Sequence, residues 1–147
     1  MKIIFLDIDG VLNSAMGKGP YISDVEVEKL ILLKDLLDRS GASGIVITSD
    51  RRYSKIDITN KIAAFEECGI KVLGLTRLPN ENDLEDNRGK QIMNYLANSE
   101  EEIDKILILD DMDDGISSLF GEEFLLVNRV YGLDKNVYLK SLTCLNK

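Results

Sequence analysis

Five short apolar runs alternate with stretches of helical periodicity from one end of the chain to the other. The apolar runs lie at residues 3–6, 44–48, 70–75, 106–109 and 124–127. Helical periodicity covers residues 24–39, 58–68, 88–97 and 135–145. Continuously apolar strands that alternate with helices are typical of a parallel sheet covered on both faces. The pattern therefore predicts an α/β fold: a doubly wound, Rossmann-like, three-layer sandwich around a five-stranded, mainly parallel sheet.

Residues that usually end helices flank the first two predicted helices. Ser23 or Asp24 is the predicted N-cap of the first helix, and Gly41 ends it. Gly69 ends the second helix. Because the 147 residues contain no repeat, linker or low-complexity tract, we expect one domain over residues 1–147.

The composition excludes several classes of protein. A formal net charge of −8 argues against an extended nucleic-acid groove, which needs clustered Lys and Arg. The absence of histidine excludes histidine-based triads and most zinc sites. The N-terminal apolar run is too short for a signal sequence, and no stretch reaches membrane-spanning length. We therefore expect a cytoplasmic protein without a membrane partner; the sequence specifies no oligomeric state.

Acidic and hydroxyl side chains follow three of the predicted strands. They are Asp7, Asp9, Thr48, Ser49, Asp110 and Asp111. The carboxyl ends of parallel strands share one edge of the sheet, so these side chains are expected to form one site. Arg88 and Lys90 begin the helix between the third and fourth strands and would bring a cation to the same edge.

This set of side chains favours phosphate chemistry with a metal ion. Asp7 and Asp9 are two residues apart, and side chains with that spacing in a strand point to the same side. Two like charges this close repel each other unless a proton, a cation or a chemical task holds them together. Clustered carboxylates without His or Cys suit Mg²⁺. An ionised Asp is also a nucleophile toward phosphorus, and Thr48 with a cation would stabilise the phosphoryl oxygens.

The order of these motifs resembles that of the haloacid dehalogenase (HAD) superfamily of phosphotransferases. The stretch Asp7-Ile8-Asp9-Gly10-Val11 resembles its first motif, Thr48 its second, and Asp110-Asp111 its fourth. The segments LDIDGVLN, GIVITSDRR, RGKQI, LILDD and the late YGL are similar to the HAD-like domain of the Swiss-army-knife RNA repair proteins. The similarity covers nearly the whole chain.

The resemblance implies roles for the acidic residues. Asp7 would attack phosphorus and form an aspartyl-phosphate. Asp9 would protonate the leaving oxygen and later deprotonate the hydrolytic water. Mg²⁺ would be held by Asp7, by the backbone carbonyl of Asp9, and by Asp110 or Asp111.

The phosphate-binding residues follow from the same resemblance. Thr48, together with the neighbouring Ser49, would bind the phosphoryl group. The cation of the third motif is Arg88 or Lys90, and Arg88 is favoured because it aligns with the Arg-Gly of the similar proteins. Only one of the two is expected to reach the site, because residues two apart on a helix point in different directions.

The substrate is expected to be a phosphate carried by a larger molecule. Residues 14–23 and 53–87 leave no room for a cap domain, so the site is open to solvent. A basic rim is expected around it, formed by Lys18, Arg51, Arg52, Lys55 and Arg129. The candidate substrates are phosphorylated nucleic-acid ends, phosphoproteins and nucleotides.

The sequence thus predicts a Mg²⁺-dependent phosphatase, and a catalytically weak phosphate- or metal-binding module is the alternative. Asp50 supports the alternative, because it adds a negative charge where the similar proteins read Ser-Ser-Trp-Arg. A calcium-binding EF-hand is excluded, because the twelfth positions after Asp7 and Asp110 are Lys18 and Gly121 instead of Glu. A receiver-type signalling domain uses similar residues in a different order along the chain.

Overall fold

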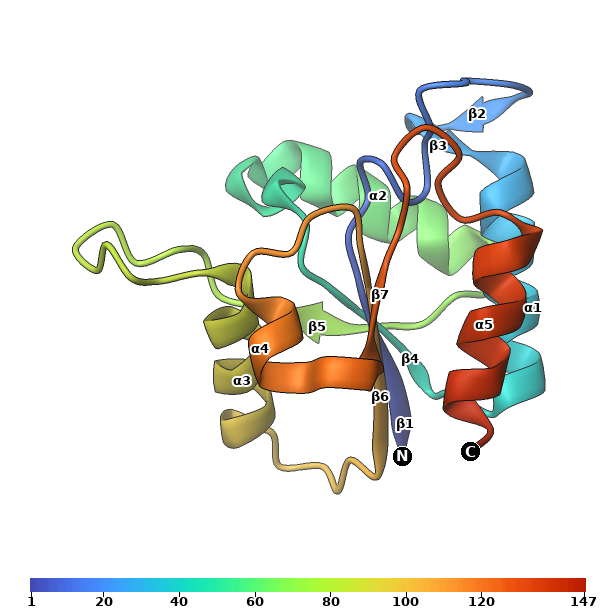
Figure 1. Ribbon diagram of the computed structural model, residues 1–147. Coiled ribbons are helices and arrows are strands. Elements are labelled where there is room, and N and C mark those ends of the chain that lie inside the picture. The colour runs from blue at the N-terminus through green and yellow to red at the C-terminus, as the bar shows by residue number, and fades with distance from the viewer.

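A five-stranded sheet forms the centre of the molecule in the computed structural model, which describes residues 1–147 (Figure 1). Its strands are β1 (Lys2–Leu6), β4 (Gly44–Ile47), β5 (Val72–Leu75), β6 (Lys105–Asp110) and β7 (Phe124–Leu126). The strand order is β5-β4-β1-β6-β7, and every neighbouring pair is parallel. The predicted doubly wound α/β fold is confirmed.

Helices cover both faces of the sheet (Figure 1). One face carries α1 (Val27–Ser40), α2 (Lys55–Glu67) and α5 (Lys135–Leu145); the other carries α3 (Arg88–Asn98) and α4 (Ile116–Phe120). Ile4 and Leu6 of β1 belong to the core under the first group, whereas Ile3 and Phe5 belong to the core under the second. Successive side chains of a strand alternate between faces, so a strand buried on both sides is apolar throughout.

Side chains just before three of the helices fix where these helices begin. Ser54 accepts a hydrogen bond from the backbone N–H of Asp57, so α2 begins three residues earlier than its apolar periodicity predicted. Asn87 and Asp134 cap α3 and α5 in the same way. Such caps satisfy backbone donors that have no partner within the helix.

The segment before α1 differs from the prediction. A two-stranded hairpin, β2 (Tyr21–Ile22) and β3 (Val25–Glu26), precedes the helix. Ser23 and Asp24 form its turn with φ values of 48° and 66°, so neither is the N-cap. Two-residue hairpin turns require this left-handed conformation, which Asn and Asp adopt more readily than most residues.

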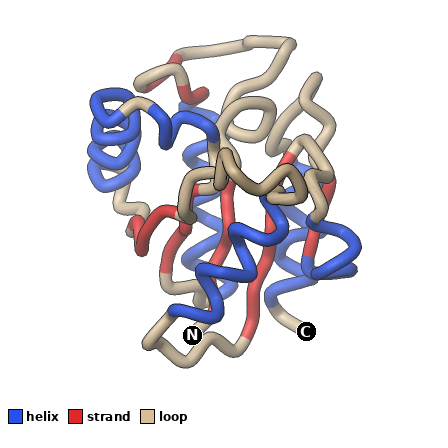
Figure 2. Tube along the Cα trace, turned by 90° about the vertical axis from the view of Figure 1, so that its left-hand side faces the viewer, coloured by secondary structure: helices blue, strands red, loops and turns tan.

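The connections leave the carboxyl edge of the sheet without a cap domain. Only the hairpin lies between β1 and α1. Only the short 3₁₀ helix η1 (Asp50–Tyr53), α2 and β5 lie between β4 and the loop before α3. Figure 2 shows the loops gathered above the strands, at the opposite end from the two chain termini. None of the helices has the length and apolar character needed to cross a membrane.

Candidate functional site

The carboxyl ends of β1 and β6 lie at the switch point of the sheet. The chain builds outward from β1 through β4 to β5 on one side and from β6 to β7 on the other. The backbone N–H of Asp7 donates to the carbonyl of Leu109 at 3.0 Å, and that of Val127 donates to the carbonyl of Asp110 at 2.8 Å. Doubly wound sheets bind ligands at this point. The backbone therefore fixes Asp7 and Asp110 where a ligand is expected.

Three carboxylates meet at the switch point. One oxygen from each of Asp7, Asp110 and Asp111 lies within 4.8 Å of the others. Asp110 is completely buried, and Asp7 is 5% exposed. The backbone N–H of Met112 donates to Oδ1 of Asp110 at 3.0 Å and fixes its orientation. The structure thus brings together the carboxyl groups of three of the four predicted metal residues, and the carboxyl group of Asp9 lies outside this cluster.

Arg88, the first residue of α3, places its guanidinium against this cluster. Its Nη1 lies 2.6 Å from Oδ2 of Asp110 and 3.5 Å from Oδ2 of Asp7. Its Nη2 lies 3.1 Å from Oδ1 of Asp50. The side chain of Lys90, two residues further, forms no ion pair. Of the two cations considered for the third motif, the geometry favours Arg88.

The start of α3 is fixed to the loop after β6. The backbone N–H of Arg88 donates to Oδ2 of Asp114 at 3.0 Å, and that of Gly89 donates to the carbonyl of Asp114 at 3.0 Å. A Cβ at Gly89 would lie 2.3 Å from the backbone carbonyl oxygen of Gly115. Only glycine permits this approach, which holds Arg88 beside Asp110.

Burial and mutual repulsion make the ionised forms of Asp7 and Asp110 unfavourable. Burial and the charge of Asp110 raise the pKa of Asp7 to about 8, although Arg88 acts in the opposite direction. Burial also raises the pKa of Asp110 against the effect of Arg88. For Arg88 itself, the charges of Asp110 and Asp7 outweigh its burial and raise its pKa. Arg88 therefore does not offset the combined effects of burial and mutual repulsion on the pKa values of Asp7 and Asp110.

This donor set fits a Mg²⁺ ion. Mg²⁺ prefers carboxylate and water oxygens, and the cluster offers hard oxygen donors with no His or Cys. A divalent cation would also supply the positive charge that Asp7 and Asp110 lack. Asp7, Asp110 and Asp111 are the side chains that would hold it.

Thr48 and Ser49 lie at the end of β4, next to β1. The backbone N–H of Thr48 donates to the carbonyl of Leu6 at 3.0 Å. Its Oγ1 is buried and has no hydrogen-bond partner. A buried hydroxyl without a partner is costly, so this hydroxyl is free to bond a ligand or a water molecule. Ser49 differs, since its Oγ already accepts the backbone N–H of Arg51 at 3.2 Å as the cap of η1.

The carboxylate of Asp9 is held by Arg51 and Asn13 and does not belong to the cluster of Asp7, Asp110 and Asp111. β1 ends at Leu6, and the backbone then turns through Gly10, whose φ is 82°. Arg51 contacts both carboxylate oxygens of Asp9, with Nε at 2.8 Å and Nη2 at 2.9 Å. Asn13 donates a third hydrogen bond to Asp9 at 3.0 Å. The hydrogen bond from Arg51 is the main cause of the lowered pKa of Asp9.

The predicted basic rim is only partly present. Arg52 is buried: its Nε donates to the carbonyl of Ser49 at 2.7 Å, and its Nη1 to the carbonyl of Thr76 at 2.9 Å. It was therefore wrongly predicted to line the rim. Arg51 pairs with Asp9 and Arg129 lies 3.4 Å from Asp111, so both are at the site. Lys18 and Lys55 are exposed.

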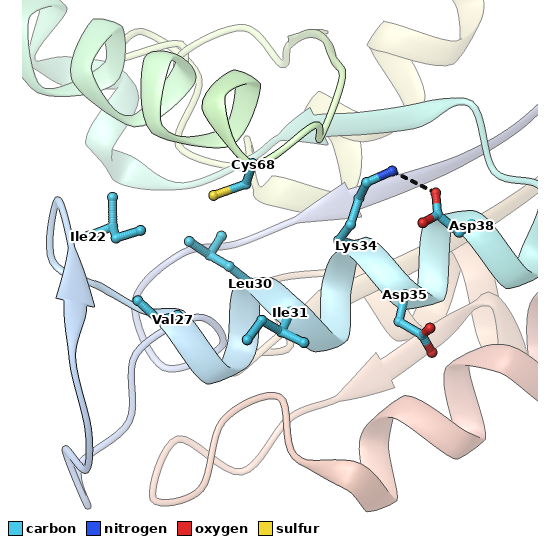
Figure 3. Close-up of a pocket in the computed structure, with 8 residues that line it drawn as sticks. All are labelled: Ile22, Val27, Leu30, Ile31, Lys34, Asp35, Asp38 and Cys68. Carbon is cyan, nitrogen blue, oxygen red and sulfur yellow. Dashed lines mark hydrogen bonds and ion pairs between the residues drawn. The ribbon is translucent and has the colours of Figure 1, made fainter.

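A separate apolar cavity of about 310 Å³ lies beside α1, between the hairpin and the end of α2 (Figure 3). Its lining residues are Ile22, Val27, Leu30, Ile31, Lys34, Asp35, Asp38 and Cys68. None of them belongs to the predicted site, so the cavity is not part of the carboxylate cluster.

Gly10 makes room for the carboxylate of Asp111. A Cβ at this position would lie 2.4 Å from Oδ2 of Asp111, and the φ of 82° is unfavourable for other residues. We expect Gly10→Ala to lower the free energy of unfolding by about 1–2 kcal/mol through the backbone alone. It should also turn Asp111 away from Asp7 and weaken Mg²⁺ binding, measured by calorimetric titration.

Gly41→Ala is the matched control for this substitution. Gly41 has a φ of 75°, and a Cβ there would meet nothing within 4 Å. It lies at the end of α1, so its replacement should reproduce the loss of stability without changing Mg²⁺ binding. Equal Mg²⁺ affinities for the two variants would contradict the role assigned to Gly10.

Several residues that shape the site were not predicted. The side chain of Asn13 contacts Asp9, and that of Asp57 contacts Arg51. The side chain of Asp114 contacts the backbone of Arg88. Only Asp114 had a visible signal, because it follows the acidic pair after β6. The others contact residues that are close only in the folded chain.

The comparison with protein families identifies the family of the chain. The family model described as the HAD domain in Swiss Army Knife RNA repair proteins matches residues 3–137. No curated protein and no solved structure matches the chain significantly. The matched region runs from β1 into α5 and includes the whole carboxylate cluster and Arg88. The chain therefore belongs to this HAD domain family, which indicates a phosphatase-like protein that acts on phosphorylated substrates.

Proposed function

We propose that the protein is a Mg²⁺-dependent hydrolase of phosphomonoesters that acts through an aspartyl-phosphate on Asp7. The observation that carries the proposal is the convergence of the three carboxylates, Arg88 and the unpartnered hydroxyl of Thr48 at the switch point. Metal ligands, a phosphate-binding cation and a free hydroxyl donor are the parts that phosphoryl transfer requires. Family membership supports the same chemistry.

Asp7 is the proposed nucleophile. An oxygen of its ionised carboxylate attacks phosphorus, the bond from phosphorus to the leaving oxygen breaks, and that oxygen takes a proton from Asp9. For this step Asp9 must carry a proton, so its pairing with Arg51, which lowers its pKa, has to loosen when the substrate binds. A water molecule then attacks the phosphorus of the aspartyl-phosphate and gives a proton to Asp9. Inorganic phosphate leaves, and the carboxylate of Asp7 is regenerated. Bound Mg²⁺ would supply positive charge that keeps Asp7 ionised and offsets the charge of the phosphoryl group.

Arg88 and Thr48 are the proposed donors to the phosphoryl oxygens. Arg88 is held by buried Asp110, so its guanidinium is oriented before the substrate binds. Fixed donors of this kind stabilise charge that develops in the transition state. Arg51 is the proposed positioning residue for Asp9, because it contacts both oxygens of that carboxylate.

The proposed substrate is a phosphate at the end of a larger molecule. No cap domain covers the carboxyl edge, and Lys18, Lys55 and Arg129 are exposed. Because the family is named for RNA repair proteins, a phosphorylated nucleic-acid end is the first substrate to test. Phosphoproteins and nucleotides are the other candidates.

The first test is the hydrolysis of para-nitrophenyl phosphate. We expect phosphate release when Mg²⁺ is added and none when EDTA removes it. A panel of 3′- and 5′-phosphorylated oligonucleotides, nucleotides and phosphopeptides, ranked by kcat/KM, would then identify the substrate class. If none of these substrates releases phosphate at any Mg²⁺ concentration, the proposal is contradicted.

The alternative is a phosphate- or metal-binding module without catalysis, which the pairing of Asp50 with Arg88 favours. Beryllium fluoride separates the two functions, because it mimics the phosphoryl group of an aspartyl-phosphate. We expect Mg²⁺-dependent stabilisation of the protein by beryllium fluoride, measured by thermal unfolding. A protein that binds Mg²⁺ but neither binds beryllium fluoride nor hydrolyses phosphomonoesters would fit the alternative.

A further inference from the structure

Arg88 has one acidic partner that the proposed mechanism does not use. Oδ1 of Asp50 lies 3.1 Å from Nη2 of Arg88 and 3.9 Å from Nη2 of Arg52. Asp50 begins η1, two residues after Thr48. Its carboxylate therefore lies beside Arg88, one of the two groups that are proposed to bind the phosphoryl oxygens.

Asp50 differs from the other acidic partners of Arg88 in its exposure. Its side chain is 72% exposed, whereas those of Asp7 and Asp110 are 7% and 0% exposed. Asp7 and Asp110 contact Nη1, and Asp50 alone contacts Nη2. Of the three acidic partners of Arg88, Asp50 is therefore the one most accessible to an anion from solvent.

We propose that Asp50 competes with phosphate for Arg88 and so weakens the binding of phosphate dianions. The inference rests on the proposed function, because it assumes that phosphate binds beside Arg88 and Thr48. An incoming dianion must displace the carboxylate of Asp50 or bind next to it, and either event is unfavourable. For a phosphatase this favours the release of inorganic phosphate, the product.

The size of the effect follows from the distance and the exposure. A unit charge a few ångströms from the phosphate interacts with it strongly, but solvent around an exposed carboxylate screens much of this interaction. We expect Asp50→Asn to tighten the binding of inorganic phosphate roughly tenfold. If turnover is present, KM and the inhibition constant for phosphate should fall together.

The test compares the affinity for inorganic phosphate by calorimetric titration with Mg²⁺ present. Asp50→Asn removes the charge, and Asp50→Glu keeps it. Asp38→Asn is the matched control, because it changes the net charge of the protein by the same amount. Asp38 lies on α1, its side chain is 60% exposed, and it pairs with Lys34 at 2.7 Å. We expect tighter binding only for Asp50→Asn.

Unchanged or weaker phosphate binding by Asp50→Asn would overturn the inference, and weaker binding would instead mean that Asp50 holds Arg88 in place. Equal tightening by Asp38→Asn would also overturn it, because the effect would then come from net charge. The measurement needs no turnover. Tighter binding without hydrolysis therefore contradicts the proposed function alone, and hydrolysis with unchanged binding contradicts this inference alone.

Discussion

Asp7→Asn is expected to lower the rate of Mg²⁺-dependent phosphate release by at least about 10³-fold. The amide of Asn cannot form the aspartyl-phosphate, and it removes one of the three carboxylates of the cluster. The measurement is the hydrolysis of para-nitrophenyl phosphate, with rapid acid quenching to trap the phosphorylated protein. The wild type should give a trapped acyl-phosphate, and Asp7→Asn should give none.

Stability measurements control for loss of structure in this variant. The raised pKa of Asp7 shows that its charge is unfavourable in the folded protein, because of burial and Asp110. A neutral amide of similar shape should therefore leave the free energy of unfolding in EDTA unchanged or increased. Equal rates of phosphate release for Asp7→Asn and the wild type would exclude Asp7 as the nucleophile.

Arg88→Met is expected to lower the free energy of unfolding by about 3 kcal/mol in EDTA. The substitution leaves the completely buried carboxylate of Asp110 without its ion-pair partner at 2.6 Å. It should also lower the rate of phosphate release by about 10²-fold, because the phosphoryl group loses a fixed donor. The measurements are denaturant unfolding and the same phosphatase assay. Added Mg²⁺ should restore part of the lost stability, since it supplies positive charge at the same carboxylates.

Two further variants separate charge from geometry. Arg88→Lys keeps the charge but cannot contact Asp110 and Asp50 through two nitrogens, so its stability should lie between those of the wild type and Arg88→Met. Arg129→Met removes an exposed arginine near Asp111 and should cost less than about 1 kcal/mol. Arg88→Met with the stability of the wild type in EDTA would contradict the importance of this buried pair.

The sheet and its long helices could be predicted from the sequence because local patterns determine them. Strands that are buried on both faces are apolar throughout, and α5 occupies the residues that its periodicity predicted. Elements without a local pattern were missed. α4 (Ile116–Phe120) is too short to show a helical period, and the two strands of the hairpin have two residues each.

The candidate site was predicted in part for the same reason. Residues at the ends of parallel strands share one edge of the sheet, which brings Asp7, Thr48 and Asp110 together. The direction of each side chain was harder to predict. Asp9 lies beyond the end of β1, where the alternation of strand side chains no longer applies. Arg51 and Arg52 are adjacent in sequence, but Arg51 contacts Asp9 whereas Arg52 is buried. Only the fold distinguishes the two positions.

The buried position of Arg52 limits where this protein could accept a longer loop. Its guanidinium bonds the carbonyls of Ser49 and Thr76 and the side chain of Gln91, and thereby joins the segment after β4, the segment after β5, and α3. Residues 81–85 are fully outside this set of bonds and exposed to solvent. An insertion there should leave Arg52 and Arg88 in place. An insertion at Thr76 would instead disturb the hydrogen bonds of Arg52 and, through Gln91, the helix that carries Arg88.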